Sequence, residues 1–171
     1  MDRPTKIQLD RQRRADEITA RLKECAADVL ANFPVEIAYL HGSVARGCPL
    51  PTSDVDVAVL LTELPPPYDR LKLEFDIQAA LEDACQLSNL DVRAINEAPV
   101  MVQGNVIQEG VLLYNRDKDR RVAFEVLTRK KFFDYRPTAE RMEQAFLDNI
   151  RRKGLSRGQT KDRYRHSEPS A

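Results

Sequence analysis

The stretch GSVARGCPLPTSDVDVAVL, residues 42–60, decides the fold that this sequence predicts. Gly42 and Ser43 follow an apolar run and form a turn. Ten residues separate that turn from the Asp-x-Asp pair that opens the next apolar run. Successive side chains of a β-strand point to opposite faces, so Asp54 and Asp56 share one face of a strand. The valines between and after them share the opposite face, and we predict that these valines belong to the core.

These residue types suit phosphate and metal binding. Two carboxylates on one face repel each other unless a cation neutralises them, and hard oxygen ligands suit Mg²⁺. Gly42 lets the backbone approach a ligand closely, and Ser43 offers a hydroxyl at a helix N-terminus, where N–H groups point toward anions. Taken singly, a Gly-Ser pair is an ordinary turn and an Asp-x-Asp pair is a solvated strand end. Their spacing between two predicted strands favours the phosphate-and-metal interpretation.

The composition indicates one domain with its own core. The chain has 171 residues, of which 42% are hydrophobic and 32% charged, and no apolar run reaches the length of a membrane span. The N-terminal residues lack the apolar segment of a signal peptide. The three cysteines (Cys25, Cys48 and Cys85) have no metal-ligand spacing, and we expect buried thiols at Cys25 and Cys85, which fall in helical patterns. These features predict a cytoplasmic protein in a reducing compartment.

The net charge of zero conceals an asymmetry. Residues 151–171 contain seven Lys or Arg and two Asp or Glu, a net charge of +5, so the first 150 residues carry −5. A basic terminus attracts nucleic acid or an acidic partner in some proteins and is a solvated tail in others. Tyr164 is the one aromatic residue of this segment, whereas single-strand binding uses several interleaved aromatics. We therefore expect no nucleic-acid partner and a disordered tail over residues 154–171.

Hydrophobic periodicity, prolines and glycines divide the chain into helices and strands. Helical spacing predicts helices at 9–33, 68–87, 98–109, 118–134 and 138–152, the first ended by Pro34 and the last two separated at Pro137. Strand patterns predict strands at 35–41, 54–61, 90–96 and 111–114. The last of these strands is short, and we expect it at an edge of the sheet.

The predicted strand 90–96 contributes a further acid. Its apolar side chains alternate with polar ones, and if its apolar face meets the same core, Asp91 projects toward the face of Asp54 and Asp56. A third carboxylate at this position completes a two-metal site. The alternative is that Asp91 pairs with Arg93, which lies two residues on and faces the same way.

Three features together resemble the minimal nucleotidyltransferase (MNT) domains of the DNA polymerase β superfamily: GSVARG, the ten-residue spacing to Asp-x-Asp, and the later strand LDVRAINEAP. The closest resemblance is to the MNT antitoxins of HEPT/MNT toxin–antitoxin pairs, and it covers about residues 15–150. It implies an α/β fold of the polymerase-β nucleotidyltransferase type, a small mixed β-sheet with flanking helices. Residues 1–153 form this domain in the prediction, and the resemblance does not explain the basic tail, 154–171.

The resemblance also implies roles for individual residues. Gly42 and Ser43 match the pair that grips the phosphates of the nucleotide. Asp54 and Asp56 match the metal ligands. Asp91 matches the third acid, which binds metal and takes part in catalysis.

Arg46 matches a recurrent basic position that contacts phosphate or product, with an ordinary surface arginine as the alternative.

The implied reaction is Mg²⁺-dependent transfer of AMP from ATP to a tyrosine hydroxyl of a cognate HEPT toxin, which silences the toxin. We expect the toxin and ATP as partners, a hetero-oligomer of toxin and antitoxin, and no membrane. Two alternatives stay open: a nucleotidyltransferase that modifies a small molecule such as an aminoglycoside, and a non-catalytic antitoxin that acts by complex formation.

Overall fold

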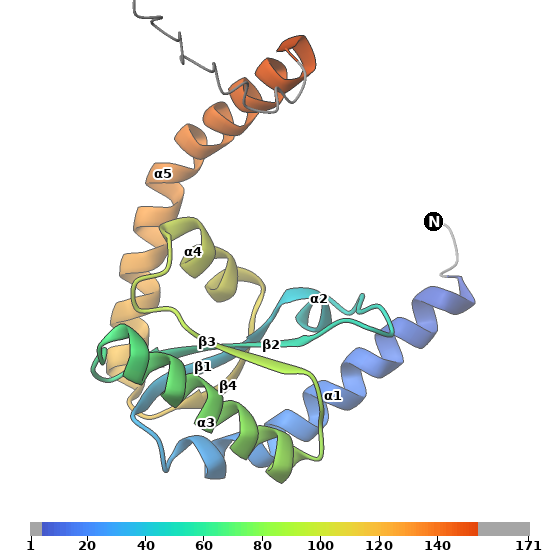
Figure 1. Cartoon of the computed structure of the whole chain (residues 1–171), viewed down its shortest axis with the longest axis vertical. Coiled ribbons are helices and arrows are strands. Elements are labelled where there is room, and N and C mark those ends of the chain that lie inside the picture. Colours follow the sequence, from blue (N-terminus) through green and yellow to red (C-terminus); the bar gives the residue numbers. More distant parts are fainter. Residues whose placement is uncertain (1–4, 154–171) are drawn as a thin grey trace, which may run out of the picture. The chain divides into compact units, whose positions relative to one another are not determined.

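The computed structural model describes residues 5–153, which form four strands and five helices (Figure 1). The chain divides into two compact units, one ending at Tyr135 and the other beginning at Arg136. The sheet and the candidate site belong to the first unit. Among the described residues, no helix is long and apolar enough to cross a membrane. The tail that the sequence predicts to be disordered, 154–171, lies outside the described residues.

The order of the strands agrees with the sequence prediction, and most boundaries differ by a few residues. The helices are α1 (Lys6–Leu30), α2 (Gly42–Ala45), α3 (Pro67–Cys85), α4 (Val100–Glu109) and α5 (Lys118–Lys153). The strands are β1 (Val35–His41), β2 (Val55–Leu61), β3 (Leu90–Ala94) and β4 (Val111–Asn115). A capping box begins α1: the Thr5 hydroxyl accepts the Gln8 N–H at 3.3 Å, and the Gln8 side chain accepts the Thr5 N–H at 2.7 Å.

The four strands form one mixed sheet in the order β3-β2-β1-β4. β1 pairs antiparallel with β2 and β4, whereas β2 and β3 run parallel because α3 provides the crossover between them. In Figure 1, α3 lies on one side of the sheet and α4 on the other. β4 is an edge strand, as the sequence predicts. The mixed α/β fold is therefore confirmed.

Apolar side chains cover both faces of the sheet. On one face α1 and α3 pack on the strands, and this cluster includes Leu22, Leu81, Val55, Val57 and Val59, all of which are buried. A smaller cluster on the opposite face joins β1, β2 and α4. Burying one such side chain fully contributes about 1.5–3 kcal/mol. The core position predicted for the alternating valines of β2 is confirmed.

β3 forms the other edge of the sheet, and side chains of α3 cover two of its N–H groups. Glu82 Oε1 accepts the Leu90 N–H, and Glu74 Oε1 accepts the Ala94 N–H, each at 2.9 Å. An edge strand with free N–H groups invites pairing with another strand, and acidic side chains at the edge oppose such pairing. The two bonds also fix β3 against α3, and with it the backbone that carries Asp91.

The cysteine prediction is wrong. Cys25 of α1 and Cys85 of α3 form a disulfide, with Cα atoms 5.6 Å apart, rather than two buried thiols. The two cysteines are 60 positions apart along the chain, so no local pattern links them. Cys48 is exposed and is a free thiol. The cysteines therefore give no support to the prediction of a reducing cytoplasmic compartment.

The predicted break at Pro137 is also wrong, because α5 continues through this residue. A proline inside a helix removes one backbone hydrogen bond and costs about 3 kcal/mol, a cost that other contacts can offset. Two side-chain bonds flank it: Arg136 Nε donates to Glu140 Oε1 at 2.7 Å, and Arg141 Nε donates to the Pro137 carbonyl at 3.1 Å. The boundary between the two compact units falls next to the proline.

Candidate active site

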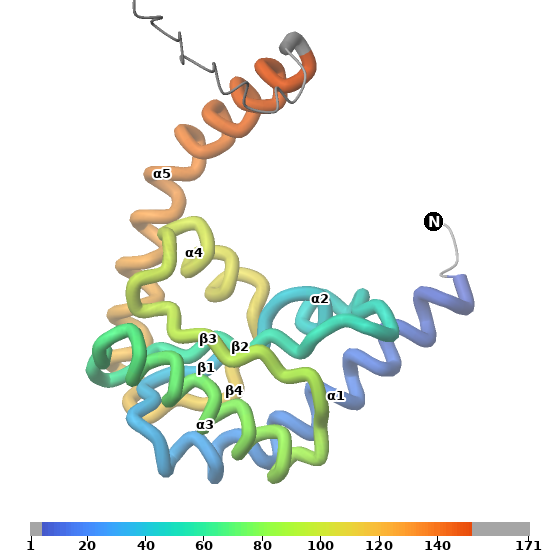
Figure 2. Tube along the Cα trace, viewed as in Figure 1, coloured from blue at the N-terminus to red at the C-terminus, as the bar shows by residue number. Residues whose placement is uncertain are grey.

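The Gly-Ser turn lies at the junction of β1 and α2 (Figure 2), as the sequence predicts. Gly42 has a φ of +72°, a left-handed conformation that residues with a Cβ atom rarely adopt. Ser43 is the second residue of α2, and its carbonyl accepts the Cys48 N–H at 3.0 Å. The Arg46 N–H donates to the Gly42 carbonyl at 3.3 Å. These bonds stabilise the tight turn that the positive φ begins.

Gly42 and Asp56 occupy adjoining space. His41, the last residue of β1, pairs with Asp56 in the antiparallel register. A Cβ atom on Gly42 would overlap Oδ2 of Asp56, so only glycine fits against this carboxylate without a rearrangement. The turn and the acid-bearing strand β2 therefore adjoin each other directly.

Three carboxylates belong to the same region of the sheet. Asp56 and Asp91 are direct partners in the parallel register of β2 and β3, so their side chains project from the same face. Asp54 lies just before β2 and is exposed. Ser53 orders the loop before it, because its hydroxyl accepts the Leu50 N–H at 2.9 Å. The structure thus places Asp91 beside Asp56, as the sequence analysis expects.

The charges in this region act on one another. Partial burial raises the pKa of Asp56, and the carboxylates of Asp91 and Asp54 raise it further, while His41 and Arg46 act in the opposite direction. Burial lowers the pKa of His41 despite the nearby carboxylates, so its neutral form is favoured. A carboxylate whose pKa is raised by its acidic neighbours is one that a bound cation would stabilise in its charged form.

Asp91 also forms the ion pair with Arg93 that the sequence offers as the alternative. Arg93 Nε lies 2.8 Å from Asp91 Oδ1, and both side chains are partly exposed. The same guanidinium lies 3.6 Å from Oε2 of Glu74, whose side chain is nearly buried. Asp91 is therefore both the register partner of Asp56 and the ion-pair partner of Arg93.

The donor chemistry of Asp54, Asp56 and Asp91 fits a divalent cation, because carboxylate oxygens are the ligands that Mg²⁺ prefers. The influence of Asp91 and Asp54 on the pKa of Asp56 indicates that the three charges are close enough to interact. Among residues 5–153, however, no three His, Cys, Asp or Glu side chains gather closely enough to hold an ion as they stand. The site has the ligand types for Mg²⁺, and Oδ1 of Asp91 is paired with Arg93.

A small pocket of about 200 Å³ opens beside the turn. Its lining comes from the turn and from α4: His41, Gly42, Arg46, Val102, Asn105, Val106 and Glu109. Arg46 Nη1 lies 3.2 Å from Glu109 Oε2, and both side chains are about half exposed, so Arg46 borders the site and has an acidic partner there. The α4 residues of this lining are not predictable from the sequence, because nothing local in the sequence places α4 against the Gly-Ser turn.

Comparisons with known proteins agree with this fold. A structure of a toxin–antitoxin with AMP-PNP is 23% identical in sequence, with a TM-score of 0.52, and the match covers 72% of this chain and 94% of that chain. A mutant of the toxin–antitoxin MntA-HpeT is 25% identical, with a TM-score of 0.51, and that match covers 72% of this chain and 93% of that chain. No curated protein matches the sequence significantly.

The family match covers the sheet and the candidate site. Residues 24–119 match the family model described as polymerase beta, nucleotidyltransferase. This range contains β1 to β4, the Gly-Ser turn and all three aspartates, and it is more than half of the chain. The chain belongs to the polymerase β-type nucleotidyltransferase family.

Proposed function

We propose that this chain is an antitoxin that transfers AMP from ATP to a tyrosine hydroxyl of a cognate HEPT-type toxin, with Mg²⁺ as the metal, and so neutralises the toxin. The observation that carries the proposal is the close approach of Gly42 to the Asp56 carboxylate, with Asp91 opposite Asp56 on β3. A phosphate site that adjoins an acidic metal site is what nucleotidyl transfer from a triphosphate requires. The family supports nucleotidyl transfer as the class of reaction.

The Gly-Ser turn and the three aspartates have separate roles in this proposal. Gly42 allows the backbone to approach the phosphates of ATP, and Ser43 supplies a hydroxyl and an N–H to them. Asp54, Asp56 and Asp91 would hold the metal. A bound divalent ion would neutralise charge on the triphosphate and lower the pKa of the attacking hydroxyl. A tyrosine hydroxyl has a pKa of about 10, so it benefits from this activation at neutral pH.

The transfer itself is a substitution at the α-phosphorus. A bond forms between the tyrosine oxygen and the α-phosphorus, and the bond from that phosphorus to the bridging oxygen breaks, so that pyrophosphate leaves. The phenolic proton needs an acceptor near the attacking oxygen. In the proposal Asp91 accepts it, because its carboxylate projects beside that of Asp56.

The nature of the partner is supported by the structural comparisons. Both solved structures described above are toxin–antitoxin structures, and one contains AMP-PNP, an analogue of ATP. A toxin subunit supplies the acceptor tyrosine in the proposal, and toxin and antitoxin form a hetero-oligomer. The cytoplasmic location is a prediction from the sequence that the proposal retains.

A non-catalytic antitoxin that acts by complex formation is the second candidate. One observation favours it: the carboxylate of Asp91 is paired with Arg93. In this second candidate, the site does not transfer AMP while Arg93 stays paired with Asp91.

Rescue of cells that express the cognate toxin separates these candidates. The wild type is compared at matched expression with Asp54→Asn/Asp56→Asn. The control is Asp76→Asn/Asp83→Asn, which removes two exposed acids from α3. AMP transfer predicts rescue by the wild type and the control variant but not by the site variant. It also predicts a toxin that stays inactive after the antitoxin is removed. Equal rescue by the site variant, with unmodified toxin, would favour complex formation and overturn the proposal.

A further inference from the structure

We propose that Arg93 is a positioning residue that occupies the Asp91 carboxylate until a divalent cation binds, and that Glu74 then receives the released guanidinium. The inference rests on the proposed function, because it requires a metal ion at the aspartates. It concerns the control of metal binding by β3 and α3, which carry the three side chains.

Arg93 stands between two carboxylates. Its Nε lies 2.8 Å from Asp91 Oδ1, and its Nη1 lies 3.6 Å from Glu74 Oε2. Different nitrogen atoms face the two partners, so the planar guanidinium can approach one carboxylate as it leaves the other. The Arg93 side chain is 57% exposed and that of Asp91 is 40% exposed. An ion pair with this exposure is weak and exchanges readily.

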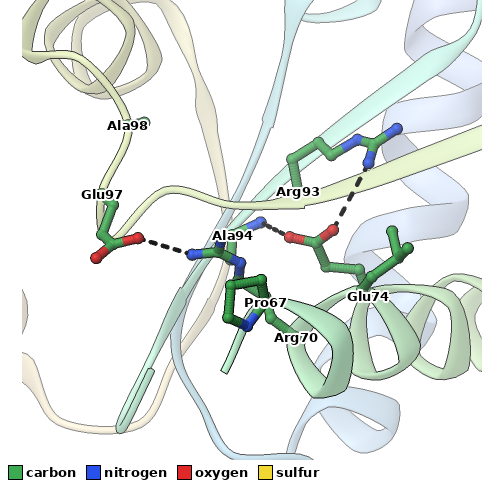
Figure 3. Close-up of a pocket in the computed structure, with 8 residues that line it drawn as sticks. Pro67, Arg70, Glu74, Arg93, Ala94, Glu97 and Ala98 are labelled. Carbon is green, nitrogen blue, oxygen red and sulfur yellow. Dashed lines mark hydrogen bonds and ion pairs between the residues drawn. The ribbon is translucent and has the colours of Figure 1, made fainter. Parts of the chain in front are cut away.

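Glu74 is the fixed member of the three. Its side chain is 11% exposed, and Oε1 accepts the Ala94 N–H at 2.9 Å, as Figure 3 shows. A nearly buried carboxylate is stable only with hydrogen bonds or a cation close by. The contact from Glu74 Oε2 to Arg93 is long enough to shorten when Arg93 turns toward it.

The surroundings give Arg93 space for this movement. Arg93 and Glu74 line a pocket of about 480 Å³ together with Arg70 and Glu97 (Figure 3). Arg70 Nη1 lies 2.9 Å from Glu97 Oε2, so this second arginine already has an acidic partner of its own. Glu74 is therefore the carboxylate on this side that can take up Arg93.

On the other side of Arg93, the metal and the arginine compete for one carboxylate. Asp91 is the register partner of Asp56, whose pKa is raised by burial and by its acidic neighbours. A divalent cation offers these carboxylates twice the charge of a guanidinium, so it attracts Asp91 more strongly at a similar distance. Asp91 therefore lies beside Asp56 in the register and is also paired with Arg93.

Binding of Mn²⁺ to the nucleotide-free protein tests the inference, with the electron paramagnetic resonance signal of free Mn²⁺ as the readout. Arg93→Gln should bind Mn²⁺ about two- to fivefold more tightly than the wild type, the gain expected from losing an exposed ion pair. Arg70→Gln removes the same charge from the same pocket but not from Asp91, and it should leave the affinity unchanged.

Glu74→Gln tests whether Glu74 receives the released guanidinium of Arg93. Glutamine keeps an acceptor for the Ala94 N–H but removes the charge that receives Arg93, so Mn²⁺ binding should weaken. The effect of Glu74→Gln should disappear in the Arg93→Gln background, because there is no guanidinium left to receive. If Glu74→Gln fails to fold, the comparison of Arg93→Gln with Arg70→Gln still tests whether Arg93 competes with the metal. Both arginines are at least partly exposed, so we expect their variants to fold.

The outcomes separate this inference from the function on which it rests. If Asp91→Asn abolishes Mn²⁺ binding but Arg93→Gln binds no more tightly than the wild type, the Arg93 inference is wrong and the metal site stands. An equal gain in Arg70→Gln would reduce the effect to general electrostatics and also overturn the inference. If the wild type binds no Mn²⁺, or binds it equally after Asp91→Asn, the proposed metal site is wrong and the inference fails with it.

Discussion

Gly42 and Asp56 lie so close together that a Cβ atom on the glycine would overlap Oδ2 of the aspartate. The two residues come from different elements, the turn after β1 and the strand β2. Their proximity means that the turn proposed to bind phosphate and the carboxylate proposed to bind metal border the same small volume. A change at either residue should therefore affect both functions.

Gly42→Ala should lower both stability and nucleotide affinity. The positive φ alone costs an alanine about 1–2 kcal/mol, and the overlap with Asp56 adds to this. Gly47→Ala is the matched control, because Gly47 has a φ of +71° and its Cβ would meet the exposed, movable Gln12 side chain. Denaturant unfolding and calorimetric titration with ATP and Mg²⁺ measure the two effects. ATP affinity in Gly42→Ala equal to that in Gly47→Ala would contradict the assignment.

Asp56→Asn should change how the stability of the metal-free protein depends on pH. The pKa of Asp56 is raised in the folded state, first by burial and then by its acidic neighbours, so the native state binds a proton more readily than the unfolded state. The unfolding free energy of the wild type should therefore fall, relative to that of Asp56→Asn, as the pH rises from the ordinary carboxyl pKa through the raised one.

Urea unfolding in a chelator, at several pH values between about 4 and 7, measures this difference. Added Mg²⁺ should then stabilise the wild type and not the variant, because a ligand stabilises only the state that binds it. The opposite result would be an unfolding free energy of the metal-free wild type that rises with pH relative to that of Asp56→Asn. That result would refute the electrostatic description of the site.

Removal of the disulfide should destabilise the fold. The bridge between Cys25 and Cys85 closes a long loop of the chain. This loop contains the Gly-Ser turn, Asp54 and Asp56. Loss of such a cross-link typically costs about 2–4 kcal/mol. Cys25→Ser/Cys85→Ala should therefore unfold at lower denaturant concentration than the oxidised wild type, while Cys48→Ser should not, because Cys48 is free and exposed. Two reactive thiols at Cys25 and Cys85 in the native protein would disprove the bridge.

Gly104→Ala should destabilise the packing of α4 on α5. A Cβ atom at Gly104 would overlap the ring of Phe132, which is only 3% exposed. Alanine gains about 1 kcal/mol in helix propensity over glycine, but overpacking of this kind costs about 1–3 kcal/mol, so the net effect should be a loss. Thermal unfolding of Gly104→Ala and of Gly104→Ala/Phe132→Leu provides the check. The double variant should recover part of the stability, and a single variant as stable as the wild type would contradict the close packing.

The parts of the fold that follow from local signals are predictable from the sequence. The predicted strand 35–41 coincides with β1, and the predicted strand 54–61 begins one residue before β2, because alternating apolar residues and flanking Gly or Pro act over short distances. The placement of Asp91 beside Asp56 also follows, since consecutive strands joined by a helix are usually neighbours. The start of α1 had a visible signal too, the pair Thr5 and Gln8, which the prediction overlooked.

The remaining features depend on tertiary contacts that no local pattern reveals. The Cys25–Cys85 bridge joins two helices far apart in sequence. The link from Arg93 to Glu74 depends on how α3 packs against β3, and the pocket lining from α4 depends on how that helix meets the turn. The rule that a proline ends a helix rests on the loss of one backbone hydrogen bond. It fails at Pro137, because α5 continues through this residue.

The central claim is that AMP is transferred covalently to a partner toxin, and the intact mass of the toxin tests it most directly. The cognate toxin is incubated with labelled ATP, Mg²⁺ and either the wild type or Asp54→Asn/Asp56→Asn. The account predicts a toxin heavier by one or more AMP units with the wild type, with the label on a tyrosine, and an unchanged mass with the variant. An unchanged toxin mass with the wild type, while the two proteins form a stable inactive complex, would contradict it.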